Sequence, residues 1–174
     1  GNGDDVYVVN TVVENGFLGL DIRPGSDRHY IRNFFGVTIQ GFISIGASHD
    51  GRVEDCHSNP NFWPRNGYGI SPWMKEGSNV FWDDYVPNLK SSNLFITLDG
   101  TLNEYLLNNF IYAGMTGVQV TSGSASIFNI GSDNVGRYTV KAANGTEVVV
   151  MNSMRYSGSG NTFGVKLSFN PLHL

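Results

Sequence analysis

The chain repeats one short pattern at nearly regular intervals, an apolar stretch that ends in Asn or Asp. Seven segments share this register, and their last residues lie 23, 22, 28, 25, 21 and 23 positions apart. An apolar residue stands two positions before each of them. A period in this range, carried by β-branched and aromatic residues, is typical of a β-solenoid. The last residues are Asn10, Asn33, Asp55, Asp83, Asn108, Asn129 and Asn152, and their apolar partners are Val8, Ile31, Val53, Phe81, Leu106, Ile127 and Val150.

We therefore predict an all-β, single-domain solenoid over residues 1–174, with about seven coils of ~22 residues. Twenty-two glycines and only 15% charged residues agree with frequent turns and few helices. Residues 6–13 already read as a full strand, with no helix or polar cap ahead of them. Because a solenoid end is normally covered, we expect a C-terminal fragment of a longer solenoid, with the N-terminal part of the parent chain as its partner.

The charge and cysteine content exclude several classes of partner. A net charge of −4 without a Lys/Arg cluster argues against nucleic acid and against an anionic membrane. No apolar stretch reaches the ~18 residues of a membrane span. Cys56 is the only cysteine, so the chain has no intrachain disulfide and no zinc spacing, and we expect neither a metal nor another cofactor.

The regular spacing breaks between Asp55 and Asn108. The 53 residues of this step are interpreted as two coils that carry an irregular, aromatic-rich loop insertion at about 58–79. All three tryptophans lie in or just after that insertion. Two interpretations of the aromatic residues stay open, because flat rings can stack on sugars or can anchor a long loop against the solenoid. The expected substrate-binding residues are His57, Trp63, Arg65, Trp73, Trp82 and Tyr85.

The repeated register also predicts how the corner side chains behave. Asparagine amides stacked at the ~4.8 Å strand spacing can bond one another, which predicts an asparagine ladder. Aspartates in the same stack would repel, so Asp55 and Asp83, with Asp84 beside them, depart from the design. Close carboxylates have separated pKa values and can work as acid and base, which makes these three the candidate catalytic residues. The alternative is that Asp83 and Asp84 are turn residues and Asp55 continues the ladder.

These features resemble the pectin-lyase-like right-handed parallel β-helix superfamily of glycoside hydrolases, polysaccharide lyases and phage tailspikes. The spacing of Asp55 and Asp83-Asp84 looks like the carboxylate arrangement of inverting polygalacturonase-type hydrolases and of β-helical α-1,3-glucanases. The resemblance implies an acid at one aspartate and water activation by the others. Because the chain lacks the Asn-Thr-Asp, Gly-His-Gly and Arg-x-Lys motifs of polygalacturonases, no narrower family is identified.

The resemblance thus leads us to expect part of a secreted glycoside hydrolase that cleaves a polysaccharide by carboxylate chemistry. Two other functions stay open. One is a non-catalytic module that binds glycans or serves as a tailspike-like or adhesin-like stalk, and the other is a polysaccharide lyase. Exposed coil ends would also allow a homotrimer.

Overall fold

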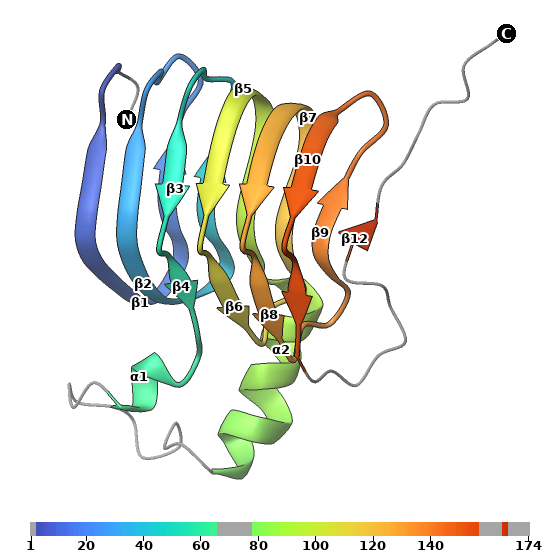
Figure 1. The fold of residues 1–174 in the computed structure, drawn as a ribbon. Coiled ribbons are helices and arrows are strands. Elements are labelled where there is room, and N and C mark those ends of the chain that lie inside the picture. The colour runs from blue at the N-terminus through green and yellow to red at the C-terminus, as the bar shows by residue number, and fades with distance from the viewer. Residues whose placement is uncertain (1–2, 66–77, 157–164, 167–174) are drawn as a thin grey trace, which may run out of the picture.

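The computed structural model describes residues 3–65, 78–156 and 165–166. Their strands form one sheet of parallel pairs, which wraps around a hydrophobic core as a β-helix-like solenoid (Figure 1). The strands are β1 (Tyr7–Ile22), β2 (Tyr30–Ile45), β3 (Arg52–Glu54), β4 (His57–Ser58), β5 (Leu94–Leu107), β6 (Phe110–Tyr112), β7 (Thr116–Phe128), β8 (Gly131–Asp133), β9 (Tyr138–Ala142), β10 (Glu147–Met151), β11 (Met154–Arg155) and β12 (Val165–Lys166). The helical elements are α1 (Phe62–Arg65), the π-helix η2 (Val80–Tyr85) and α2 (Val86–Ser92).

The sheet has three rows of strands, which we name by their place in Figure 1. The front strands are residues 7–9, 30–32, β3, 105–107, 126–128 and β10. The lower strands are residues 11–13, 34–36, β4, β6, β8 and β11. The rear strands are residues 18–22, 41–45, 94–98, 116–120, β9 and β12. The long strands β1, β2, β5 and β7 bend around corners and contribute to more than one row.

Six of the seven apolar residues in the predicted register stack inside the solenoid, and the seventh, Phe81, does not. Along the front strands, Val8 pairs with Ile31, and the stack continues through Val53, Leu106, Ile127 and Val150. The four middle residues of this stack are at most 1% exposed. Since side chains alternate between the two faces of a strand, their neighbours lie on the outer face of the sheet. Burial of each such side chain stabilises the fold by about 1.5–3 kcal/mol.

The predicted asparagine ladder lies at the corner between front and lower strands. All six residues of the ladder have φ between 51° and 55°, a left-handed conformation that Asn and Asp tolerate better than other non-glycine residues. They are Asn10, Asn33, Asp55, Asn108, Asn129 and Asn152. The Nδ2 of Asn33 donates to Oδ1 of Asn10 at 2.9 Å. Asn129 donates to Asn108 at 2.9 Å, and Asn152 donates to Asn129 at 2.6 Å. The amide groups therefore bond from one turn to the next, as predicted.

The step from Asp55 to Asn108 differs from the prediction. β3 pairs directly with β5, and Val53 lies beside Leu106, so these 53 residues make one turn where neighbouring turns take 21 to 23. The described part of the segment between β4 and β5, residues 59–65 and 78–93, lies outside the sheet and holds α1, η2 and α2. It extends further along the chain than the expected insertion at 58–79. We call these described residues, 59–65 and 78–93, the arm; Figure 1 shows its helices below the solenoid.

The C-terminal end of the arm is hydrogen-bonded to the solenoid at the corner between the lower and rear strands, which we call the lower corner. Asn93 is 2% exposed, and its Nδ2 donates to the carbonyl oxygen of Thr38 at 2.6 Å. The Lys90 ammonium donates to Oδ1 of Asn134 at 2.9 Å. A Cβ on Gly136 would lie 2.2 Å from the Lys90 carbonyl oxygen, so only glycine lets α2 approach this closely. These contacts hold α2 against several turns at once.

An ion pair lies inside the solenoid near the corner where the rear strands lead into the front strands. His29 Nε2 lies 3.0 Å from Glu104 Oε1, and both side chains have no exposed surface. The His29 Nδ1 bonds the carbonyl oxygen of Ser26 at 3.0 Å. Burial lowers the pKa of His29, but the hydrogen bond and charge of Glu104 outweigh burial, and the net shift is upward. Gly51 lies between the two side chains, because a Cβ there would lie 2.1 Å from His29 Nε2 and 2.5 Å from Glu104 Oε2.

Candidate functional site

The outer face of the front strands carries a network of charged and aromatic side chains. We name its members the front cluster: Tyr30, Arg32, Arg52, Glu54, Asp55 and Tyr105. The Tyr30 hydroxyl donates to Glu54 Oε2 at 2.9 Å, and Arg52 forms an ion pair with the other oxygen of Glu54. The Arg52 guanidinium lies 5.2 Å from the centre of the Tyr105 ring. An open groove of about 340 Å³ runs beside these last two residues and is also lined by Asp50, Gly51 and Asn103.

Asp55 is a rung of the asparagine ladder with a hydrogen-bond donor on each side. Asn108 Nδ2 donates to its Oδ1 at 3.3 Å, and Arg32 Nε donates to its Oδ2 at 3.0 Å. A carboxylate cannot donate onward to Asn33 as an asparagine would, so the chain of amide donors stops here. Arg32 thus compensates for the charge that Asp55 introduces. Both oxygens of the proposed catalytic Asp55 take part in structural bonds.

Asp83 and Asp84 do not stack on Asp55, which corrects the predicted register. Both are exposed on η2 in the arm, whereas the rung next to Asp55 is Asn108. The reason is that an apolar residue two positions before an aspartate also fits a helix, and Phe81 is buried in a cluster of its own with Val86 and Ala113. Within the described part of the chain, no group of three or more His, Cys, Asp or Glu side chains is arranged to hold a metal ion.

The arm aromatics mostly pack against one another. The ring centres of Trp63 and Tyr85 lie 5.4 Å apart, and those of Phe81 and Tyr85 lie 5.8 Å apart. The Tyr85 hydroxyl is buried, and among the described residues it has no hydrogen-bond partner. Burial, with a smaller contribution from the negative charge of Glu14, raises the pKa of Tyr85. Tyr85 and Trp63 therefore anchor the arm, in line with the loop-anchoring interpretation.

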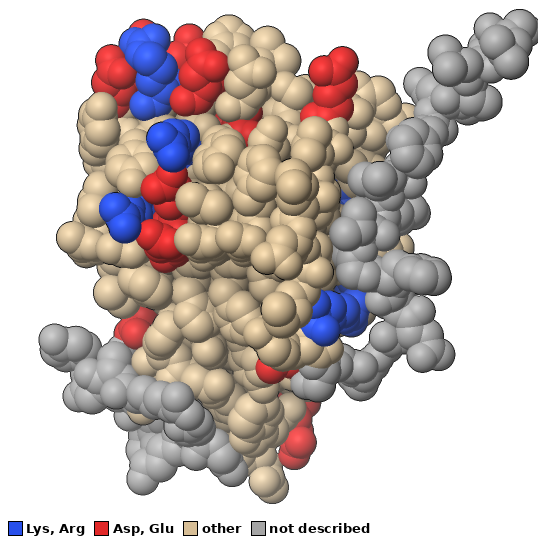
Figure 2. All heavy atoms as spheres, viewed as in Figure 1, with Lys and Arg blue, Asp and Glu red and all other residues tan. Residues whose placement is uncertain are grey.

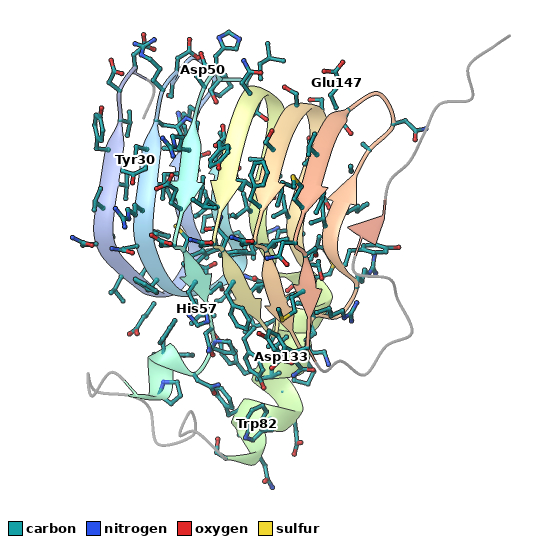
Figure 3. The ribbon with its side chains drawn as sticks, in the orientation of Figure 1. Tyr30, Asp50, His57, Trp82, Asp133 and Glu147 are labelled. Carbon is teal, nitrogen blue, oxygen red and sulfur yellow. The ribbon has the colours of Figure 1, made fainter. Side chains whose placement is uncertain are left out.

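Trp82 is the arm aromatic that faces solvent. It is 39% exposed, and it lies low on the arm, well separated from Tyr30 on the front strands (Figure 3). Trp73 lies outside the described residues, and so does the side chain of Arg65, whose backbone ends α1. Of the six predicted substrate-binding residues, the structure thus brings Trp63 and Tyr85 together and leaves Trp82 on the surface.

His57 lies in a cage of aromatic rings on the lower strands. Its ring centre is 4.9 Å from that of Phe110, 5.0 Å from Phe62 and 6.4 Å from Phe35. Its buried Nε2 has no hydrogen-bond partner in the described part of the chain. Burial among these rings lowers the pKa of His57 to about 4, because the charged form loses its hydration. His57 is therefore neutral near pH 7 and fastens α1 to the solenoid.

Two carboxylates that the sequence did not single out occupy unusual surroundings. Glu14 of β1 is half-buried, and burial raises its pKa. Its charge acts on Tyr85, which places it near the aromatic cluster of the arm. Glu104 is fully buried beside His29. No local sequence signal marks either residue, because each depends on a partner more than 70 positions away.

A second open groove lies where the asparagine ladder meets the lower strands. Its volume is about 280 Å³, and it is lined by Asn108, Asn109, Phe110, Asn129, Ile130, Gly131, Asn152, Met154 and Tyr156. None of these side chains carries a charge. Figure 2 shows that charged side chains gather over the first strands of the front face, while the middle of the surface over β5, β7 and β10 is uncharged. The charge on this wall is therefore concentrated over the first strands, although Glu147 at the top of β10 is also charged.

Comparisons with protein-family models, with curated proteins and with solved structures found no match. None of the described helices is long and apolar enough to cross a membrane.

Proposed function

We propose that the chain is a secreted carbohydrate-binding module that holds a polysaccharide along the outer wall of front and lower strands. One observation carries the proposal: rings and hydrogen-bonding side chains repeat on this wall at the ~4.8 Å spacing of parallel strands. Tyr7, Tyr30, Arg52 and Tyr105 are neighbours in one outward row. A polymer of regular repeats matches such a surface, since aromatic faces stack on sugar rings and amides bond hydroxyls.

Binding has more support than cleavage at the front cluster. Acid and base catalysis needs one carboxyl that keeps its proton and a second that does not. Glu54 and Asp55 are each held in an ion pair, Glu54 with Arg52 and Asp55 with Arg32. Both carboxyl groups are therefore engaged in bonds within the cluster, whereas the exposed rings and amides of the wall are available to a ligand.

We also infer right-handed winding and membership of the pectin-lyase-like superfamily. Crossovers between parallel strands are right-handed in about 98% of cases. Figure 1 supports this hand, since the front strands run downward and the chain returns upward behind them as it advances to the right. A homotrimer stays a prediction, which sedimentation would test.

Affinity electrophoresis on gels cast with plant and microbial polysaccharides tests the binding proposal. We expect at least one polysaccharide to retard the protein, with neither reducing ends nor unsaturated products released during incubation. Release of unsaturated products would identify a lyase. Equal migration of the folded protein in every gel would reject the proposal.

Hydrolysis is the second candidate, and Glu14 is the observation that favours it. A carboxyl with a raised pKa suits a general acid, and the charge of Glu14 acts on Tyr85 of η2, the element that also carries Asp83 and Asp84. If the wild type releases reducing ends, Glu14→Gln and Asp84→Asn should each abolish the release, with Asp83→Asn tested beside them. Glu147→Gln, at an exposed glutamate on β10, is the matched control and should keep full activity. Equal activity of all four variants would exclude this assignment.

A further inference from the structure

The uncharged groove beside the asparagine ladder is formed by a gap in a row of large side chains. Phe35, His57, Phe110, Gly131 and Met154 are consecutive neighbours in the outward row of the lower strands. Gly131 interrupts this row. A Cβ at that position would lie 2.6 Å from Cδ2 of Phe110, so the glycine lets the Phe110 ring lie over the backbone and leaves the space above it open.

Two rings form the apolar side of the groove. The ring centres of Phe110 and Tyr156 lie 6.1 Å apart with 60° between their planes. Tyr156 is 57% exposed and Met154 is 48% exposed. Solvent-facing rings at an open hollow present flat apolar surface to a ligand that also has apolar faces, as a sugar ring has in its C–H groups.

The ladder amides form the polar side. Each Asn side chain has two N–H donors and one oxygen acceptor with two lone pairs. The ladder bonds Asn129 to Asn108 and Asn152 to Asn129 use one donor or one lone pair at each end. Exposed Asn108, Asn129 and Asn152 therefore keep donors and acceptors for a ligand, and Oδ1 of Asn152 accepts no bond from the described residues. Their spacing along the ladder is ~4.8 Å, comparable to the length of a sugar ring.

From these contacts we infer that the groove between Tyr156 and the ladder residues Asn108, Asn129 and Asn152 is a subsite for an uncharged glycan. The inference rests on the proposed binding function and deepens it by naming the place and the sugar class. An acidic or sulfated sugar would bring its charge into a groove whose lining offers no cation. A neutral sugar instead stacks on Phe110 and Tyr156 while its hydroxyls bond the amides. The charged groove beside Arg52 lies outside this subsite.

Isothermal titration of the full chain with cellohexaose, xylohexaose, mannohexaose and hexagalacturonate tests the inference. We expect one neutral hexasaccharide to bind more tightly than hexagalacturonate. Tyr156→Ala should weaken that binding about tenfold, the size of effect typical of an aromatic contact at the centre of an interface. Asn152→Gly, which suits the left-handed backbone there, should weaken it several-fold.

Phe17→Ala is the matched control, because Phe17 is an aromatic residue 63% exposed on β1 that lies outside the groove and outside the front and lower strands. It should bind within about twofold of the wild type, and far-UV circular dichroism should show all variants folded. Binding that survives Tyr156→Ala but is lost in Arg52→Ala would overturn the subsite and leave the proposed function intact. Tighter binding of hexagalacturonate would overturn the sugar class. Absence of binding to all four probes would count against the subsite, and the electrophoresis on polysaccharides then decides the function separately.

Discussion

The substitution Gly51→Ala gives the sharpest test of the buried His29–Glu104 pair. The added Cβ would lie 2.1 Å from His29 Nε2, whereas ordinary contact requires ~3.5 Å. One side chain must therefore move by more than about 1 Å, and the 3.0 Å bond between His29 and Glu104 would be lost. Overpacking a core costs about 1–3 kcal/mol, and separation of a buried ion pair costs about 3–5 kcal/mol. We expect the free energy of unfolding to fall by about 3–5 kcal/mol.

Urea unfolding followed by circular dichroism measures this loss. With a slope of about 2 kcal/mol per molar urea, the midpoint should fall by about 2 M. Gly3→Ala is the control, because nothing lies within 4 Å of a Cβ there, and its unfolding free energy should stay within about 0.5 kcal/mol of the wild type. In a His29→Ala, Glu104→Ala background the space is vacant, and Gly51→Ala should then cost less than about 1 kcal/mol. The same large cost in both backgrounds would refute the reasoning.

The pH dependence of the wild type gives a second readout of the same pair. Contacts with Glu104 raise the pKa of His29 above its ordinary value of 6.5. The stability that the charged pair contributes is fully present below pH ~6.5 and is lost as the pH rises through the raised pKa. In Gly51→Ala the free energy of unfolding should depend less on pH in this range, because the variant moves Glu104 away from His29 and so removes the interaction that raises the pKa of the imidazole. An unchanged pH profile above pH 6.5 would show that another group is responsible.

Three further predictions concern the cage and the ladder. Burial lowers the pKa of His57 from 6.5 to about 4, so the folded protein favours the neutral imidazole. The free energy of unfolding should therefore fall by about 2 kcal/mol as the pH drops from 6.5 to 4, a figure reduced for the partial exposure of the ring. Urea midpoints measured for His57→Leu over the same pH range should lack this decrease. Asn129→Ala should lower the free energy of unfolding by about 2–3 kcal/mol, through left-handed backbone strain and broken ladder bonds, whereas Asn129→Gly should lower it by only about 1 kcal/mol. Equal losses for the two variants in thermal unfolding would show that backbone strain contributes nothing. Asp55→Asn restores a donor toward Asn33, so its melting temperature should stay within about 3 °C of the wild type; a larger drop would mean that the carboxylate is essential to the fold.

The corner ladder was predictable because two local requirements coincide there. A left-handed residue favours Asn or Asp, and the inward strand position two residues earlier must be apolar. A second left-handed row, Asp5, Arg28, Asp50 and Asn103, precedes four ladder residues by five positions. Three of its four members are Asn or Asp, so its signal was also in the sequence.

The arm and the buried His29–Glu104 pair could not be predicted from the sequence, and the reasons differ. In the arm a misleading pattern is present, whereas for the pair no pattern exists. Phe81 and Asp83 satisfy the strand pattern by coincidence, since π-helical η2 also buries one side chain and exposes the next. Periodicity alone does not separate these cases when the step between repeats varies. The His29–Glu104 pair depends on a glycine one turn away from each partner, and no local pattern records that relation. Catalysis by Asp55, Asp83 or Asp84 stays a prediction, although their separation removes the stacking on which it was based.

At the lower corner the molecule separates into two parts, the stacked strands of the solenoid and the arm that is attached to them. The turns of β6 and β8 cross this corner with residues 113–115 and 134–137, whereas the third turn carries the arm between β4 and β5. The strands on both sides keep register, as Phe35 beside His57 and Gly41 beside Leu94 show. Evolution can therefore lengthen, trim or replace this single excursion while the stacked scaffold stays the same. Diversification of related chains should concentrate at that hinge point, much as antibody loops vary on a constant framework.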